Sequence, residues 1–237
     1  MAQTAHRLLT TNGIRMHVAE QGEGPLVILC HGFPQIWYSW RHQLPALAKA
    51  GFHAVAPDQR GYGKTDGPEP IEAYDILQLT GDIVGLVHAL GEERAFIVGH
   101  DWGARVAWTC ALLRPDMFDA LVFSVPYRPR SKETIPPTEA MRRMAGDQEY
   151  YQLYFQEPGK AEKEMEADVR RTMLMWLYSL SGDAPPGKRW RYLFSKSEKF
   201  MDSIYFPDKL PAWLTDRDLD VSAEEFERTG FRGGINW

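Results

Sequence analysis

The chain has 237 residues, of which 44% are hydrophobic and 25% are charged, and its formal net charge is −5. These proportions are those of an ordinary globular protein, and a domain of this length buries roughly 70–75% of its unfolded surface. The negative charge argues against a nucleic-acid-binding protein, which would carry a basic face, so we expect no nucleic-acid partner.

Strand and helix signals alternate through the first half of the chain. Two expected strands, over 8–10 and 14–19, flank Asn12-Gly13, which is a strong hairpin turn signal. Four short apolar runs are typical of buried strands, and three segments have helical spacing. The expected strands cover 26–30, 53–57, 95–98 and 120–125, and the expected helices cover 40–50, 75–90 and 103–113. This order predicts an α/β fold with a mostly parallel sheet and helices on both faces.

The pattern changes near residue 128. No strand signal appears beyond this point, and apolar residues with the spacing of one helical face are Ala161, Met165, Val169, Met173, Trp176 and Leu180. We therefore expect two domains. The first, over 1–127, is the core, and the second, over 128–237, is a helical insertion that covers the carboxyl edge of the sheet.

Targeting segments and metal sites leave no signal in the sequence. The N-terminus is polar, without the apolar stretch of a signal peptide, and no apolar run approaches the roughly 20 residues of a membrane span. Cys30 and Cys110 lie in apolar segments, which predicts buried, reduced thiols. Paired Cys or His ligand spacing is lacking, so we expect no metal and no cofactor. The sequence favours a cytoplasmic protein and leaves its oligomeric state open.

One motif, Val98–Gly103, joins an expected buried strand to an expected buried helix. Its order, small–x–nucleophile–x–small, is that of a nucleophile elbow with Asp in the place of Ser. The turn is sharp, so the neighbours must be small, as Gly99 and Gly103 are. It presents Asp101 at a helix N-terminus, where a carboxylate is favoured and attacks without a base. Asp101 is the candidate nucleophile, and an N-cap Asp between two glycines is the alternative.

A second motif, His31–Pro34, follows the preceding apolar run. In a fold with such an elbow, the oxyanion is held by the backbone N–H after the nucleophile and by one from this loop. We therefore expect the amides of Trp102 and Phe33 to form an oxyanion hole. The loss of one such donor typically costs about 2.7–4 kcal/mol of transition-state stabilisation. The bond before Pro34 is a candidate for a cis peptide.

Five strings occur in the order HGFPQIWYSWRHQ, APDQRGYGKTD, VGHDWGA, YYQLYFQEPG and FRGGINW. Together they resemble the soluble epoxide hydrolases of the α/β-hydrolase fold over nearly the whole chain. The resemblance implies that water is added to a small apolar epoxide, through an Asp alkyl ester, to give a vicinal diol. It also implies a helical cap with two tyrosines that hold the epoxide oxygen. The first matches Tyr151, and the second would follow the string at 234–237.

Tyrosine suits this role because a phenol stays protonated at pH 7 and can donate as the ring opens. Tyr150 and Tyr154 are the alternatives if the register differs. The residues expected to line the substrate pocket are Pro34, Trp37, Tyr38, Gln152 and Phe155. Plain core packing is the alternative role for the aromatic ones.

The resemblance further implies a His that activates water and an acid that orients it, both following the nucleophile in the chain. All seven histidines precede Asp101, and residues 126 and 127 at the alternative acid position are Pro126 and Tyr127. His100 should point away from the carboxylate. We therefore expect a truncated form that is inactive or reacts once. A protein completed by a second chain and a stable pseudo-enzyme are the alternatives.

Two other functions remain open. Haloalkane and haloacid dehalogenases share the Asp nucleophile, but the first usually has Asn where Phe33 stands, and the second prefers Arg where Trp102 stands. A non-catalytic ligand-binding protein on the same scaffold is the third possibility.

Overall fold

The computed structural model describes residues 3–125 and 135–237 of the chain. Contacts group the chain into two compact units, Met1–Arg128 with Asn236–Trp237, and Pro129–Ile235. The predicted domain boundary, between residues 127 and 128, lies outside the described residues, as do Pro126 and Tyr127.

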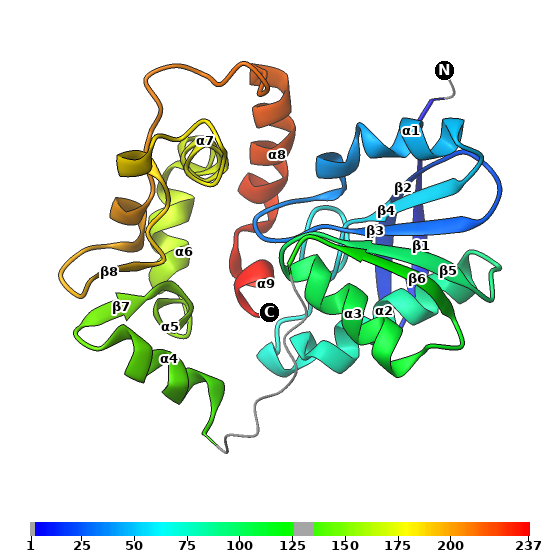
Figure 1. Cartoon of the computed structure of the whole chain (residues 1–237), viewed down its shortest axis with the longest axis horizontal. Coiled ribbons are helices and arrows are strands. Elements are labelled where there is room, and N and C mark those ends of the chain that lie inside the picture. Colours follow the sequence, from blue (N-terminus) through cyan, green and yellow to red (C-terminus); the bar gives the residue numbers. More distant parts are fainter. Residues whose placement is uncertain (1–2, 126–134) are drawn as a thin grey trace. The chain divides into compact units, whose positions relative to one another are not determined.

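Within the described residues, the first unit is built on a six-stranded sheet in the order β1-β2-β4-β3-β5-β6 (Figure 1). The strands are β1 (Ala5–Thr11), β2 (Ile14–Gln21), β3 (Leu26–Cys30), β4 (His53–Pro57), β5 (Ala95–Gly99) and β6 (Phe118–Phe123). Strands β4, β3, β5 and β6 are parallel, whereas β1 and β2 form an antiparallel hairpin. Asn12 and Gly13 take φ values of 43° and 78°, which suit its tight turn. The predicted mostly parallel α/β sheet is confirmed.

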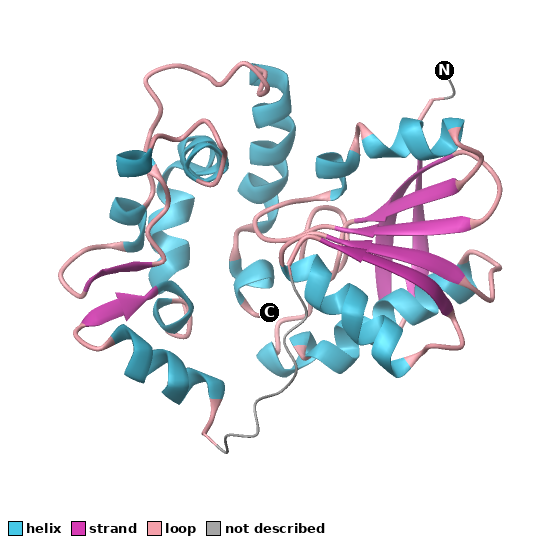
Figure 2. Cartoon of the chain, in the orientation of Figure 1, coloured by secondary structure: helices cyan, strands magenta, loops and turns pink. Residues whose placement is uncertain are grey.

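Helices cover both faces of this sheet (Figure 2). They are η1 (Trp37–Trp40), α1 (Gln43–Lys49), η2 (Ile71–Tyr74), α2 (Ile76–Ala89) and α3 (Trp102–Leu113). The single helix predicted over 40–50 was wrong in its first turn, because the chain there forms η1 before α1 begins. Asp75 caps α2, since its carboxylate accepts the backbone N–H groups of Leu77 and Gln78 at 2.9 and 2.8 Å.

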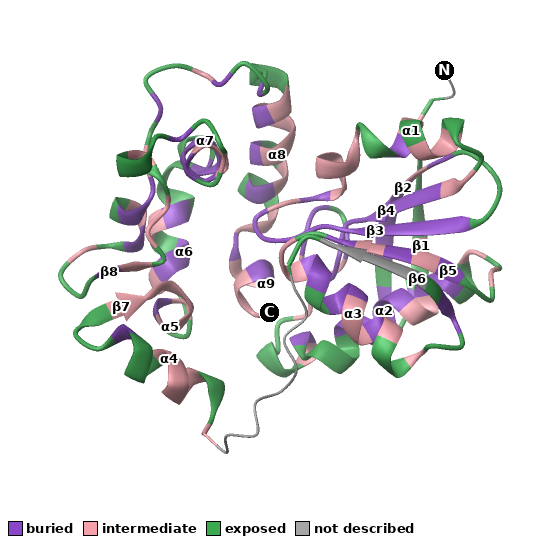
Figure 3. Cartoon of the chain, viewed as in Figure 1, coloured by how far each residue is buried: buried purple, intermediate pink, exposed green. Residues whose placement is uncertain are grey.

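The alternation along β3 supplies two separate hydrophobic cores. Leu26, Ile28 and Cys30 face α2 and α3, whereas Val27 and Leu29 face α1. Buried positions therefore run without a break along this strand (Figure 3), which explains why its sequence is wholly apolar. Cys30 and Cys110 are free and buried, as predicted. Burial raises the pKa of the Cys110 thiol to about 12, so it stays protonated near neutral pH.

The second unit is made of short helices and a small β ribbon (Figure 2). Its helices are α4 (Pro137–Ala145), α5 (Tyr151–Tyr154), α6 (Lys160–Met165), η3 (Glu166–Asp168), α7 (Val169–Ser179), η4 (Pro186–Lys188), η5 (Phe200–Ser203), α8 (Asp216–Thr229) and α9 (Arg232–Ile235). The prediction that no strand follows residue 128 was wrong, because β7 (Gln148–Tyr150) pairs with β8 (Leu193–Ser195). Each of these strands has 3 residues, too few for a visible alternation.

The predicted helical face over 161–180 is likewise divided. Helix α6 ends at Met165, and α7 starts afresh after Asp168, whose carboxylate accepts the Arg171 N–H at 2.9 Å. A cap residue thus separates two helices that share one apolar spacing. No helix in the described ranges is long and apolar enough to cross a membrane.

Candidate active site

Asp101 lies at the tip of the turn between β5 and α3. Its φ of 53° and ψ of −122° are rare for a residue with a side chain, and they are the strained geometry of a nucleophile elbow. The flanking glycines have no room for a larger residue. A Cβ on Gly99 would lie 2.4 Å from Gly103 O, and one on Gly103 would lie 2.3 Å from Cys30 O. Close packing of strand against helix therefore fixes the position of Asp101.

One oxygen of the Asp101 carboxylate is hydrogen-bonded by the loop after β3. The Phe33 backbone N–H donates to Asp101 Oδ1 at 3.0 Å. Gly32 makes this approach possible, because a Cβ there would lie 2.4 Å from the same oxygen. The peptide bond between Phe33 and Pro34 is cis, and Pro34 is buried. The geometry brings together two of the predicted residues, Phe33 and Asp101.

The backbone of the elbow is also tied to the residue that follows β6. The Asp101 N–H donates to Ser124 Oγ at 3.2 Å, and His100 Nδ1 lies 2.8 Å from the same oxygen. Ser124 in turn donates its backbone N–H to Gly99 O at 3.1 Å. His100 is thus engaged by the end of the neighbouring strand, in keeping with its expected direction away from the carboxylate.

Trp102, the predicted second oxyanion donor, is the first residue of α3. Its indole stacks with the Arg105 guanidinium at 4.7 Å and lines an apolar pocket of about 280 Å³. Leu79 of α2, Val106 of α3 and Trp237 also line this pocket. The position of Trp102 follows from the elbow, because the residue after the tip begins the helix.

The histidine of the loop after β3 is wholly buried. His31 Nε2 accepts the Gln59 backbone N–H at 3.0 Å, so His31 Nδ1 carries the proton and donates to Gly32 O at 2.9 Å. Burial lowers the pKa of His31, which keeps the ring neutral near pH 7. The neutral His31 ring therefore stabilises the loop through one nitrogen that accepts a hydrogen bond and one that donates.

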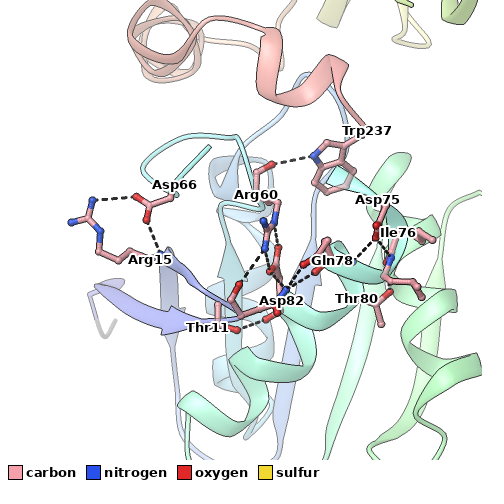
Figure 4. A network of polar contacts seen from close by, with 12 residues as sticks. Thr11, Arg15, Arg60, Asp66, Asp75, Ile76, Gln78, Thr80, Asp82 and Trp237 are labelled. Atoms are coloured by element: carbon pink, nitrogen blue, oxygen red, sulfur yellow. Dashed lines mark hydrogen bonds and ion pairs between the residues drawn. The ribbon is translucent and has the colours of Figure 1, made fainter. Parts of the chain in front are cut away.

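An ion pair anchors the loop after β4 from below (Figure 4). Arg60 Nε lies 2.7 Å from Asp82 Oδ2, and their side chains are only 4% and 2% exposed. Asn12 Nδ2 and Thr11 Oγ1 complete the network by donating to Asp82 Oδ1 and Asp82 O at 2.9 and 2.8 Å. The hydrogen bond to Asp82 raises the pKa of Arg60, and Arg60 O accepts the indole N–H of Trp237 at 3.0 Å.

Trp37 and Tyr38, two predicted pocket residues, lie in η1 and are half-buried. Their rings meet edge to face at 5.4 Å, and the Arg41 guanidinium lies 4.7 Å from the Tyr38 centroid. They follow directly on the loop that carries Phe33 and Pro34. One described segment therefore supplies four of the predicted residues.

Tyr151, the predicted epoxide-binding tyrosine, is the first residue of α5 in the second unit. Its backbone N–H donates to Tyr192 O at 3.1 Å. Its ring lies 5.2 Å from Tyr150, 5.6 Å from Phe155 and 4.7 Å from Trp190. Aromatic neighbours thus surround the ring on several sides.

The remaining residues of the predicted set also lie on or next to α5. Gln152 is half-buried, and its carbonyl accepts the side-chain amide of Gln156 at 3.2 Å. Phe155 caps the helix and packs against Phe200, with ring centroids 5.0 Å apart. Both residues therefore contribute to the α5 neighbourhood of the second unit.

Tyr154 has a different environment from Tyr151. It is buried, its hydroxyl donates to Glu164 Oε1, and Lys160 Nζ lies 4.2 Å above its ring. Burial, together with the Glu164 carboxylate, raises the pKa of Tyr154. Its hydroxyl is therefore committed to a partner inside the second unit.

Comparison with known proteins gives the family. A family model described as alpha/beta hydrolase fold matches residues 25–197. Epoxide hydrolase A of Mycobacterium tuberculosis is 50% identical over 243 residues, a match that covers all of this chain and 74% of that protein. Epoxide hydrolase 2 of Siraitia grosvenorii is 43% identical, covering all of this chain and 72% of that protein.

The chain belongs to the epoxide hydrolase family.

Solved epoxide hydrolases share its fold. Epoxide hydrolase A from Mycobacterium thermoresistibile superposes with a TM-score of 0.92 at 49% identity, covering 99% of this chain and 74% of that one. An epoxide hydrolase from an endophytic Streptomyces gives 0.94 at 48%, covering 100% and 71%. The α/β-hydrolase fold predicted from the five strings is thereby confirmed.

Several residues that hold this candidate site together carry no strong signal in the sequence. Ser124 carries no motif, and its signal is its place just after a parallel strand, where strand ends gather at one edge of the sheet. Asp58 and Gln59 stand in one of the five strings without a predicted role. The described ranges contain no group of three or more His, Cys, Asp or Glu placed to hold a metal.

Proposed function

We propose that this chain carries the chemistry of epoxide opening, with Asp101 as the nucleophile. The observation that supports this most is the Asp101 carboxylate at a strained elbow, with Oδ1 hydrogen-bonded by the Phe33 N–H at 3.0 Å. That bond orients the carboxylate so that Oδ2 is the attacking oxygen. A carboxylate needs no base for this step, because it is already ionised at neutral pH.

In the first step, Oδ2 attacks the less hindered carbon of the epoxide. The ring carbon–oxygen bond breaks, and the oxygen takes the proton of the Tyr151 hydroxyl, leaving a hydroxyalkyl ester on Asp101. In the second step, water adds to Cγ and releases one proton, which replaces the proton that Tyr151 gave up, and negative charge collects on Oδ1. The amides of Phe33 and Trp102 stabilise that charge until the carbonyl re-forms and the Cγ–Oδ2 bond breaks. The diol then leaves with Oδ2, which takes the remaining proton of the water. In this proposal the residues that contact the substrate are those expected from the family strings, Pro34, Trp37, Tyr38, Gln152 and Phe155.

The choice of Tyr151 rests on its place in the family string, and Tyr154 is set aside because of its own hydrogen bond. A buried hydroxyl that already donates to Glu164 has to break that bond before it can donate to an epoxide oxygen. Tyr151 lies in the matching position of the family string, and its ring is only partly buried. The tyrosine-bearing unit acts as the cap in this proposal.

We further propose that this 237-residue chain reacts about once. The two histidines that follow β3 and β5 already have hydrogen-bond partners. His31 bonds Gly32 and Gln59, and His100 bonds Ser124. General acid–base help is worth about 10²–10⁴ in rate, so hydrolysis of the ester should be slow without it.

Intact mass spectrometry after incubation with styrene oxide tests this function. We expect a single adduct on the wild-type chain, none on Asp101→Asn, and slower adduct formation by Tyr151→Phe. Tyr150→Phe is the matched control and should react like wild type. An adduct that persists in Asp101→Asn refutes the nucleophile, many turnovers to diol refute the single reaction, and halide release from a haloalkane favours the dehalogenase alternative.

A further inference from the structure

Two loops that follow parallel strands lie against each other in the first unit. The first loop, 31–36, follows β3, and the second, 58–66, follows β4, its parallel neighbour. Carboxyl ends of neighbouring parallel strands meet at one edge of the sheet, so contact between such loops is expected. The Phe33 amide, which bonds the Asp101 carboxylate, stands in the middle of the first loop.

Consecutive residues of the second loop hold both ends of the first. At one end, Gln59 donates its backbone N–H to His31 Nε2 at 3.0 Å, and its side-chain amide to His31 O. At the other end, Asp58 Oδ1 accepts the Trp37 backbone N–H at 2.9 Å. Both Asp58 and Gln59 are buried, with 1% and 2% of their surface exposed. Phe33 lies between these two anchors.

The buried Asp58 carboxylate has more than one partner. Its Oδ2 accepts from His17 Nδ1–H at 2.7 Å and from the Lys64 N–H at 3.1 Å. A Cβ on Gly63 would lie 2.3 Å from this oxygen, so glycine leaves the space that the carboxylate fills. Burying a charge costs several kcal/mol unless such donors compensate it. Fixed donors therefore hold the Asp58 carboxylate in a single position.

The segment between the anchors is itself stiff. Gly32 O accepts the Gln35 N–H at 3.0 Å and the His31 Nδ1–H at 2.9 Å, while the Gly32 N–H donates to Gln35 Oε1 at 3.1 Å. A displacement at either anchor is therefore passed on to Phe33 instead of being absorbed. Hydrogen bonds weaken steeply as distance and angle depart from the optimum, so the Phe33 donor is sensitive to such a displacement.

We propose that Asp58 and Gln59 are positioning residues for the oxyanion site. They act through the 31–36 loop, and they fix the Phe33 N–H where negative charge develops on Asp101 Oδ1 as the ester is cleaved. The inference rests on the proposed function, because it takes Phe33 as an oxyanion donor. It adds to that function the reason why the donor is already aimed at the carboxylate.

Two substitutions separate the anchors. Asp58→Asn keeps the shape but puts an NH₂ group where one carboxylate oxygen accepts N–H groups. Gln59→Met keeps the length and removes the donor to His31 O. The matched control is Leu86→Ala on α2, which empties core volume in the same unit at a residue with 0% exposure. It lowers the free energy of unfolding without touching either loop.

The main measurement is cleavage of the Asp101 ester by hydroxylamine. The ester is formed with styrene oxide, and hydroxylamine then attacks Cγ. The Cγ–O bond to the alkyl group breaks, the alkoxide takes a proton, and the products are an Asp101 hydroxamate and the diol. Charge passes through Oδ1 in this step, so intact mass followed over time reports on the Phe33 donor without needing a histidine base.

We expect both variants to cleave the ester about 10–100-fold more slowly than wild type, because a misplaced oxyanion donor loses most of its effect. Leu86→Ala should cleave it like wild type, and all four proteins should react alike once unfolded in urea. The substitutions should not change the binding of hydroxylamine. The cleavage rate should therefore fall by the same factor at every hydroxylamine concentration. Cleavage at the wild-type rate in both variants overturns the proposal, even where stability falls.

Amide hydrogen exchange gives a second readout that does not depend on the ester. At equal global stability, the Phe33 and Trp37 amides should exchange faster in Asp58→Asn and Gln59→Met than in Leu86→Ala. Unchanged exchange at both amides shows that the anchors do not hold the loop and overturns the positioning role. If the wild-type chain forms no ester, the proposed function is wrong. The exchange measurement then still shows whether Asp58 and Gln59 hold the 31–36 loop in place. If Asp58→Asn does not fold, Gln59→Met carries both measurements.

Discussion

The two units of this epoxide hydrolase bury different kinds of side chains. The first unit encloses charged and polar groups beside its apolar cores, among them Asp58, Arg60, Asp82 and His31. The second unit buries a cluster of aromatic rings among its aliphatic side chains, with Tyr154, Trp176, Phe194 and Phe200 in ring contact. Stability in the first unit thus depends on matched hydrogen bonds as well as on apolar burial, whereas in the second unit it depends more on the packing of rings and aliphatic side chains.

This difference follows from what each unit has to hold. The candidate nucleophile and its hydrogen-bonding loop are placed by strand ends, and buried charges keep the loops there in one position. The candidate tyrosine stands instead on a helix of 4 residues, too short to be stable alone, whose position depends on surrounding rings. Polar groups specify one geometry, whereas aromatic packing tolerates small shifts.

The largest expected effect comes from breaking a buried charge pair in the first unit. Arg60→Met leaves Asp82 buried with its charge uncompensated, and such a loss typically costs about 3–5 kcal/mol. Urea unfolding of wild type and variant measures it. The double variant Arg60→Met/Asp82→Leu should recover part of the loss, because neither charge then remains. Equal losses in the single and double variants would assign the effect to packing instead.

Removing volume tests the second unit in the same way. Met173 on α7 is 1% exposed, and Met173→Ala should lower the free energy of unfolding by about 2–5 kcal/mol, through lost contacts and the cavity left behind. Met144 on α4 is 58% exposed, so Met144→Ala should stay within about 0.5 kcal/mol of wild type. Urea midpoints of the two variants decide this, and a Met173→Ala loss as small as that of the control would show that the unit is loosely packed.

The two units also differed in how well the sequence predicted them. Strands β3 and β4 have the predicted bounds, because strands buried on both faces appear as continuous apolar runs. Strand β6 lies two residues earlier than predicted. In the second unit, β7 and β8 were missed. Their pairing is decided by chain segments far apart in sequence, with Gln148 opposite Ser195, and not by local alternation.

The residues of the candidate site also differ in whether the local sequence predicts them. Asp101, Phe33 and Trp102 were predictable because elbow and loop are local motifs. Ser124 and Asp58 were not, because their hydrogen bonds join residues that only the sheet brings together: Ser124 reaches back to the elbow, and Asp58 reaches Trp37. Local sequence carries the chemistry of a site, whereas its supports depend on tertiary neighbours.

Mild acid should destabilise the first unit more than the second, because all seven histidines lie in the first. Burial lowers the pKa of His31 below its ordinary 6.5, and burial, followed by the nearby His17, lowers that of His6. Below pH 6.5 the unfolded chain takes up protons that the folded chain refuses. Stability is therefore complete above this pH and lost as pH falls, by at most about 1.4 kcal/mol per pH unit for each such group.

Amide exchange, corrected for its intrinsic pH dependence, should then show β3 losing more protection than α7 between about pH 7.5 and 5.5. His31→Asn should flatten this dependence, since it removes a fully buried imidazole whose pKa is lowered by burial. The carboxylates of Asp58 and Asp101 favour protonation of His31 and so work against burial. An equal loss of protection in the two units would mean that these charges outweigh burial, and that buried histidine does not distinguish the first unit from the second.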